Sequence, residues 1–247
     1  MTEGGFEAGI FLIDKPAGVT SFSVVAMVRR LLGIKKVGHA GTLDPFATGL
    51  LIVCAGRPAT RMISRFMDSD KEYEATLQLG VETETLDPEG KITSKREVPS
   101  TTAEEVERVL DRFRGEQLQV PPAYSALKHK GKPLYHYARK GIKVVKEPRT
   151  VHIYELVRLG ENEEIGPDRD QLEIRVRCSK GTYIRTLGAD IGRELGCGAY
   201  LTALRRTRSG CFSVENSVDG AQLSGDEGKK HLLDGLLSIE DVSNLLQ

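Results

Sequence analysis

The stretch Gly38-His-Ala-Gly-Thr-Leu-Asp-Pro-Phe-Ala-Thr-Gly49 places one carboxylate, that of Asp44, where neither a regular helix nor a regular strand is favoured. Its three glycines allow backbone conformations that residues with a Cβ atom disfavour. Pro45 restricts Asp44 to the extended region and removes the next backbone donor. The apolar run 50–55 follows at once and predicts a buried strand. A fixed acid on a tight loop beside a core strand can serve as a nucleophile or a base, whereas a structural Asp-Pro turn is the alternative.

Hydrophobic periodicity elsewhere predicts a mixture of strands and helices. Apolar or alternating runs predict strands over residues 9–13, 50–55, 73–79, 151–159 and 171–178. Helical spacing predicts helices over residues 20–32, 58–67, 101–113 and 182–195. Gly33 ends the first of these, and a capping box of Thr102 and Glu105 begins the third. Half-buried strands with long connections favour one α+β domain around a large, mainly antiparallel mixed sheet flanked by helices.

The composition is that of an ordinary globular protein. Of 247 residues, 39% are hydrophobic and 28% are charged, which allows a sizeable core. The first residues carry no basic segment typical of a signal peptide, and the longest apolar run is too short to cross a bilayer. The four cysteines form no Cys-x-x-Cys pair, so we expect reduced thiols in a cytoplasmic core and no metal site.

The formal net charge is zero, but the charges are segregated along the chain. Residues 128–149 hold eight Lys or Arg against one acid, and residues 177–208 hold seven against two. The compensating acids lie in residues 82–116 and after residue 214. Segregation lets one face attract phosphates while another offsets the total charge, although a solvated basic face without a partner is the alternative.

Regular periodicity fails between Pro121 and Gly141. This segment mixes bases, chain breakers and the aromatic residues Tyr124, Tyr135 and Tyr137. Basic and aromatic side chains together are typical of surfaces that hold looped or single-stranded RNA. The sequence therefore predicts an RNA-clamping insertion over about 121–149.

The motifs from Gly9-Ile-Phe-Leu-Ile-Asp-Lys-Pro16 to Leu204-Arg-Arg206 resemble, in their order, the bacterial TruB-type pseudouridine synthases, which modify uridine 55 in the T-loop of tRNA. The resemblance covers most of the chain and includes Ala126-Leu-Lys128 and Gly131-Lys-Pro-Leu-Tyr135, which are similar to a thumb-like insertion of that family. It implies the pseudouridine synthase fold, with a central catalytic cleft across the sheet. It also implies a cytoplasmic isomerase that flips its target base in the tRNA T stem-loop. No cofactor, metal, membrane or obligate protein partner is implied.

The same resemblance assigns roles to residues of this chain. Asp44 becomes the catalytic nucleophile, which attacks C1′ of the ribose or C6 of the base. Arg185, in Gly181-Thr-Tyr-Ile-Arg185, pairs with that acid, and Tyr73, in Lys71-Glu-Tyr-Glu-Ala75, stacks on the base and takes part in proton transfer at C5. The residues implied to contact substrate are His39, Tyr183, Leu204, Lys128, Lys130, Lys132 and Arg139. Ordinary packing, surface exposure or a loop hydrogen bond is the alternative for each.

One departure from the family concerns the C-terminal part. Little follows Phe212, so we expect a catalytic domain over 1–214 and a short helical extension over 215–247 in place of a full PUA domain. Three alternative functions compete: an RNA chaperone for tRNA folding, the synthase subunit of a guide-RNA particle, and an aspartyl-phosphate hydrolase. Asp44, Tyr73 and Arg185 together disfavour a non-catalytic chaperone. An aspartyl-phosphate hydrolase would need a second acid two residues after Asp44, where this chain has Phe46, or a metal cluster.

Overall fold

The computed structural model describes residues 6–142, 144–160 and 164–246. The chain divides into two compact units, and each is described by itself. Unit 1 comprises Met1–Glu72 and Arg205–Gln247, and unit 2 comprises Tyr73–Leu204. In the described part of the chain, no helix combines the length and apolar character needed to cross a bilayer.

Unit 1 is built on a mixed sheet whose strands follow the order β14-β1-β3-β12. β1 and β2 each pair antiparallel with β3, β12 pairs parallel with β3, and β14 and β15 pair with β1. Its strands are β1 (Gly9–Lys15), β2 (Val37–Ala40), β3 (Thr48–Ala55), β13 (Phe212–Ser213), β14 (Val218–Asp219), β15 (Leu236–Leu237) and the end of β12 (Ala199–Ser209). Its helices are α1 (Ser21–Leu32), α2 (Arg57–Thr60), α3 (Ile63–Met67), α7 (Gly228–Asp234) and α8 (Ile239–Leu245), with 3-10 turns at Val214–Asn216 and Gln222–Ser224.

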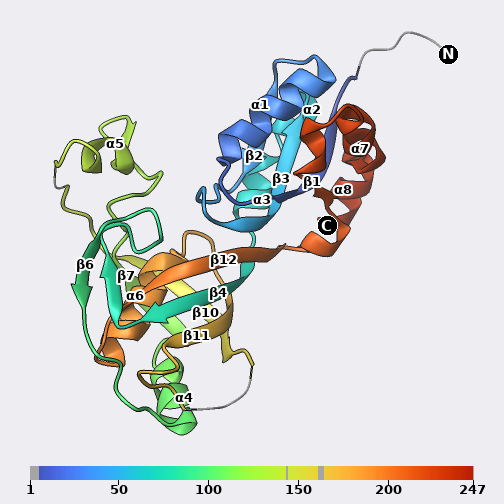
Figure 1. Cartoon of the computed structure of the whole chain (residues 1–247). Helices are drawn as coiled ribbons and strands as arrows, with labels where there is room; N and C mark the ends of the chain where they lie inside the picture. The colour runs from blue at the N-terminus through green and yellow to red at the C-terminus, as the bar shows by residue number, and fades with distance from the viewer. Residues whose placement is uncertain (1–5, 143, 161–163, 247) are drawn as a thin grey trace. The chain divides into compact units, whose positions relative to one another are not determined.

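Both faces of the unit 1 sheet are covered, which explains why β1 and β3 are apolar without alternation. Successive residues of β3, such as Leu51 and Ile52, enter two different cores. One core receives side chains from α1 and α7, and the other receives them from α2, α3 and α8. Figure 1 shows the N-terminal elements in blue beside the C-terminal helices in red, so the two ends of the chain build one unit.

The helix predictions for unit 1 were right in one case and wrong in another. Thr20 caps the start of α1, and Gly33 ends it in the left-handed conformation at φ 68°, as expected. The single helix predicted over 58–67 is instead divided into α2 and α3. The break lies at Met62, whose N–H bonds to Ala59 O at 3.0 Å in a turn tighter than an α-helix.

Unit 2 contains a second run of sheet, in the order β12-β4-β11-β10-β7. β10 pairs antiparallel with both β11 and β7. Strict alternation in β11 buries Leu172, Ile174, Val176 and Cys178, which confirms the predicted strand. The strands of unit 2 are β4 (Lys71–Leu79, from Tyr73), β5 (Val81–Thr83), β6 (Ile92–Lys95), β7 (Gly115–Gln119), β8 (Lys128–His129), β9 (Lys132–Pro133), β10 (Arg149–Arg158) and β11 (Gln171–Cys178). Its helices are α4 (Ala103–Asp111), α5 (Leu134–Ala138) and α6 (Ile184–Glu194).

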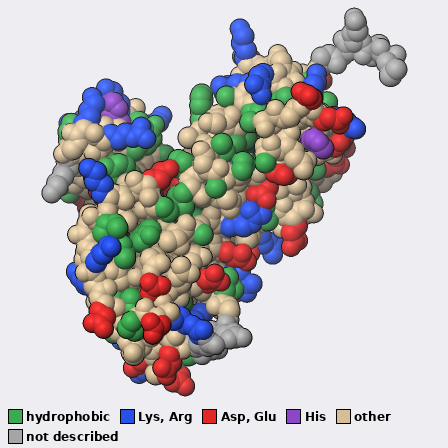
Figure 2. All heavy atoms as spheres, viewed as in Figure 1, with side chains coloured by type: hydrophobic (Ala, Val, Ile, Leu, Met, Phe, Trp, Pro, Cys, Tyr) green, Lys and Arg blue, Asp and Glu red, His purple; other side chains and the backbone are tan. Residues whose placement is uncertain are grey.

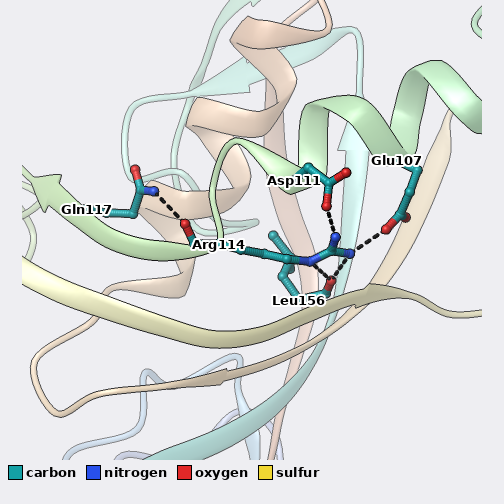
Figure 3. A network of polar contacts seen from close by, with 5 residues as sticks. All are labelled: Glu107, Asp111, Arg114, Gln117 and Leu156. Carbon is teal, nitrogen blue, oxygen red and sulfur yellow. Dashed lines mark hydrogen bonds and ion pairs between the residues drawn. The ribbon is translucent and has the colours of Figure 1, made fainter.

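Helix α4 begins with the predicted capping box of Thr102 and Glu105. Beyond its C-terminal end, Arg114 forms ion pairs with Glu107 and Asp111 of this helix. The same guanidinium donates two hydrogen bonds, of 2.9 and 2.6 Å, to the carbonyl of Leu156 in β10 (Figure 3). Arg114 therefore fastens α4 to the sheet.

The large mixed sheet flanked by helices confirms the predicted fold class. The central cleft and the domain boundary at residue 214 stay predictions, although Leu223, Leu232 and Val242 from the predicted extension enter the cores of unit 1. Cys54, Cys178 and Cys197 are buried as expected. Cys211 is exposed, so its predicted place in the core is wrong, because it sits at the turn between β12 and β13.

Candidate functional site

Asp44 lies in an irregular loop, residues 41–47, that connects β2 to β3 in unit 1. The backbone on both sides of Asp44 is held by other elements. Ser21 of α1 exchanges two hydrogen bonds with the backbone of Leu43, at 2.9 and 3.1 Å. The Pro45 carbonyl accepts from Gly18 N at 2.9 Å and from the ammonium of buried Lys15 at 3.3 Å. Because the backbones of Leu43 and Pro45 are both held, the position of Asp44 between them is fixed.

The side chain of Arg206 closes the base of this loop. It is buried, and it donates from Nε to the Leu50 carbonyl at 2.7 Å and from Nη2 to the Gly41 carbonyl at 3.0 Å. Gly41 begins the loop, and Leu50 lies three residues after its end. The backbone of Arg206 approaches β3 so closely that a Cβ atom on Gly49 would lie 2.3 Å from the Arg206 carbonyl oxygen. Only glycine fits there, and its φ of 101° is one that other residues rarely adopt.

His39 lies on β2, half-buried, two residues before the loop. Burial lowers the pKa of its imidazole, and the Arg206 guanidinium lowers this pKa further, against a smaller opposite effect of the Gly41 backbone. The ring is therefore neutral at pH 7. A neutral, half-buried imidazole can replace an uncharged base in a stack without bringing a second cation into the site.

Arg185 lies in the first turn of α6 in unit 2, and its side chain is buried. Nη1 donates to the Thr85 carbonyl at 2.7 Å, and Nη2 donates to the Tyr124 carbonyl at 2.7 Å. Nη1 also lies 3.2 Å from Oδ2 of buried Asp87. A surface position for this arginine is thereby excluded, whereas its pairing with Asp44, a residue of unit 1, stays a prediction.

Asp87 was missed by the sequence reasoning, although a signal was present. The tetrapeptide Thr-Leu-Asp-Pro occurs twice, at residues 42–45 and at residues 85–88. In the second copy, Oδ1 of Asp87 accepts from the hydroxyl of Thr85 and, at 3.0 Å, from Glu89 N. Leu86 adopts the left-handed conformation, at φ 62°, which costs a residue with a Cβ atom about 1 kcal/mol or more. In both copies, the aspartate before the proline is held in place by surrounding contacts. The aspartate of the second copy, Asp87, forms the ion pair with Arg185.

The other residues predicted around the base lie in unit 2. Tyr183 occupies the N-cap position of α6, two residues before Arg185. Its N–H donates to Gln119 Oε1 at 2.7 Å and its carbonyl accepts from Gln119 Nε2 at 3.1 Å. Buried Gln119 thus fixes the backbone of Tyr183, a role that no sequence pattern predicted. Tyr73 is half-buried on β4, and Leu204 is buried on β12.

The predicted RNA-clamping insertion carries its cations on the outside. Lys128, Lys130, Lys132 and Arg139 are all exposed. The Arg139 guanidinium lies 5.5 Å from the ring centroid of Tyr135, whose side chain is also exposed. Figure 2 shows blue Lys and Arg side chains, with a histidine, gathered over the segment of α5. Lys143, which contributes to the predicted charge, lies outside the described residues.

A second basic surface was not predicted. Lys36, Arg57 and Arg61 line a cleft of about 380 Å³ in unit 1, together with Thr60 and residues of β2. No acid is among its lining residues, so the described cleft has the chemistry to hold phosphate groups. It lies along the strand that carries His39.

Comparison with solved structures gives close matches over nearly the whole chain. The crystal structure of an archaeal box H/ACA sRNP Nop10-Cbf5 complex matches 96% of this chain with a TM-score of 0.66 and 27% identity. A Cbf5-Nop10-Gar1 complex matches 94% with a TM-score of 0.68 and 30% identity. The chain spans 61% and 60% of the length of those chains.

Comparison with family models supplies the class. Residues 29–184 match the TruB family pseudouridylate synthase N-terminal domain, and residues 185–241 match the tRNA pseudouridylate synthase B C-terminal domain. By class, therefore, the chain is a pseudouridylate synthase, an isomerase. More narrowly, it belongs to the TruB family.

Individual relatives agree with this assignment. A tRNA pseudouridine synthase B from Desulfotalea psychrophila is 62% identical over 247 residues, which is 100% of both chains. Another, from Francisella philomiragia, is 47% identical over 95% of this chain and 75% of that protein. The family resemblance predicted from the motifs is confirmed.

Proposed function

We propose that this chain converts uridine 55 in the T-loop of tRNA to pseudouridine, with Asp44 as the nucleophile. The observation that carries the proposal is the anchored loop of Asp44, whose neighbours are held by Ser21 and Lys15 and whose base is closed by Arg206. Holding a carboxylate in a fixed geometry removes most of the entropic cost of bringing it to the reacting carbon. Because tRNA is the substrate, the proposed location is the cytoplasm.

The reaction breaks the bond between ribose C1′ and uracil N1 and rejoins C1′ to C5 of the same base. One proton leaves C5 and one is taken up at N1, so the atoms balance without a co-reactant. The carboxylate of Asp44 attacks C1′ or C6, and either route needs an ionised acid, as is usual for aspartate at pH 7. Tyr73 stacks on the base and takes part in removing the C5 proton.

The target base has to leave its stack to reach Asp44, and flipping costs a few kcal/mol. Neutral His39 fills the space that the base vacates, while Tyr183 and Leu204 line the pocket that receives it. Cations of the insertion and of the cleft at Lys36 hold the surrounding phosphates. Their exposure and the absence of acids from the lining of the described cleft support this division of labour.

The test is to incubate the protein with an unmodified tRNA transcript and to map pseudouridine at single-nucleotide resolution. The wild type should form it at position 55, and Asp44→Asn should form none while binding the transcript about as tightly. Asp226→Asn, an exposed change on unit 1, is the matched control and should keep full activity. Product from Asp44→Asn near the wild-type rate would remove the nucleophile assignment. Binding without any product from the wild type would favour the RNA-chaperone alternative.

A further inference from the structure

Tyr124 connects the RNA-clamping insertion to the buried arginine of unit 2. Its backbone carbonyl accepts from Nη2 of Arg185 at 2.7 Å. Its phenol donates to Oε1 of Glu84 at 3.0 Å. Glu84 immediately precedes Thr85, whose carbonyl accepts from Nη1 of the same arginine at 2.7 Å. Arg185, Tyr124 and the Glu84–Thr85 segment therefore form a closed set of contacts, hereafter the arginine clasp.

The part of the insertion that carries α5 follows Tyr124 in the chain. The Ser125 carbonyl accepts from the backbone N–H of Tyr135 at 3.1 Å, and the Leu127 carbonyl accepts from Leu134 N at 2.8 Å. These bonds seat the first turn of α5 on the segment that follows Tyr124. A displacement of α5 is thereby passed to Tyr124.

Two further observations concern Tyr124 and its neighbour Ser125. Burial and the neighbouring Glu84 carboxylate raise the pKa of the Tyr124 phenol, so it remains a donor at neutral pH, while the Arg139 cation of the insertion acts in the opposite direction. The hydroxyl of Ser125 is buried without a hydrogen-bond partner among the described residues. A buried hydroxyl without a partner is unfavourable, so Ser125 adds little to the stability of the segment next to Tyr124.

We propose that Tyr124 is a positioning residue that couples the insertion to Arg185. When RNA holds the insertion, the Tyr124 carbonyl fixes the guanidinium in its working orientation, and the bond from the phenol to Glu84 keeps Tyr124 in place. This inference rests on the proposed function, because the working orientation of Arg185 is the one that serves the catalytic acid.

The experiment compares Tyr124→Phe, Glu84→Ala, Glu84→Gln and the double variant Tyr124→Phe/Glu84→Ala. Single-turnover rates are measured with each protein in saturating excess over an unmodified tRNA transcript, and affinity is measured by filter binding. Tyr154→Phe is the matched control, because it also removes one phenol hydroxyl of unit 2, but from an exposed tyrosine of β10 that lies outside the insertion.

Each of Tyr124→Phe and Glu84→Ala should slow the reaction about tenfold, with the affinity within about twofold of the wild type. The double variant should be no slower than either single variant, since both remove the same contact. Glu84→Gln keeps an acceptor for the phenol and should recover most of the rate. Tyr154→Phe should react at the wild-type rate.

Wild-type rates for both single variants would overturn the clasp, as would rate losses that multiply in the double variant. An equal loss in Tyr154→Phe would also overturn it, because the loss of any phenol hydroxyl in unit 2 would then suffice. These results are read only with a wild type that forms pseudouridine. A wild type without product would instead refute the proposed function itself.

Discussion

The Arg185 guanidinium and the Asp87 carboxylate form a buried ion pair, with Nη1 3.2 Å from Oδ2 and neither side chain more than 5% exposed. A buried guanidinium requires a counter-charge, since removing one partner of such a pair leaves an uncompensated ion away from water. Asp87 is itself fixed by Thr85 and by Glu89 N, so it sets the direction of the arginine as well as its charge.

Asp87→Asn should therefore damage both stability and activity. The amide keeps the shape of the side chain but loses the charge that compensates Arg185. We expect a loss of about 3 kcal/mol in the free energy of unfolding and a fall in turnover of about tenfold or more. Urea denaturation and the rate of pseudouridine formation on saturating tRNA check the two parts. Full activity in this variant would show that Asp87 does not orient the arginine.

Local sequence patterns predicted the elements whose side chains meet the core in a simple period. β11 alternates strictly, and α1 carries its capping signals at Thr20 and Gly33. The helix over 58–67 was wrong because the apolar spacing cannot distinguish one helix from two short ones that bury the same face. The short strands β2, β5 and β6 were missed because each is too short to show a hydrophobic period. β2 is a strand because it pairs with β3, and β5 and β6 are strands because they pair with each other.

The residues of the candidate site likewise divide into those that sequence motifs predicted and those that they did not. Asp44 and Arg185 stood out because motifs marked them. Arg206 and Gln119 received no predicted role, because their roles arise from contacts with residues far away in the chain, such as those from Arg206 to Gly41 and Leu50. Asp87 was missed although the repeated tetrapeptide Thr-Leu-Asp-Pro marked it. Long-range contacts of this kind depend on the tertiary fold, which no local pattern encodes.

Arg206 closes the loop of Asp44 through two carbonyls, which gives a second prediction. Lysine at this position keeps the positive charge but presents a single ammonium in place of the planar fork that reaches both Gly41 and Leu50. Arg206→Lys should slow turnover by up to about 100-fold, since small displacements of a catalytic group are costly. Arg208→Lys, on an exposed position of the same strand, is the control. Equal rates for the two variants would mean that the loop holds its shape without the guanidinium.

A third prediction concerns the pH dependence of stability. His39 has its pKa lowered by burial and by Arg206, so the unfolded chain binds the proton more readily than the folded chain. The contribution of neutral His39 is fully present above the ordinary histidine pKa of about 6.5 and is lost as the pH falls through the lower folded value.

The wild type should thus lose stability between pH 7.5 and pH 5 by more than His39→Gln does. Urea midpoints at the two pH values measure the difference, and His231→Gln, on α7, serves as the control that should behave as the wild type. If the midpoints of His39→Gln shifted as much as those of the wild type, protonation of this histidine would not be what destabilises the fold in acid.

The last prediction concerns the exposed cations of the insertion. Neutralising Lys130, Lys132 and Arg139 together should weaken tRNA binding and flatten its dependence on salt, since each lost phosphate contact lowers the slope of log K against log salt by about one unit. Turnover on saturating tRNA should suffer much less, because these side chains are exposed and take no part in the chemistry. Neutralising Lys95, Lys229 and Lys230, which are exposed on other elements, provides a control with the same change of charge. An unchanged slope with a collapsed turnover would instead mean that the insertion positions the base and does not hold the RNA.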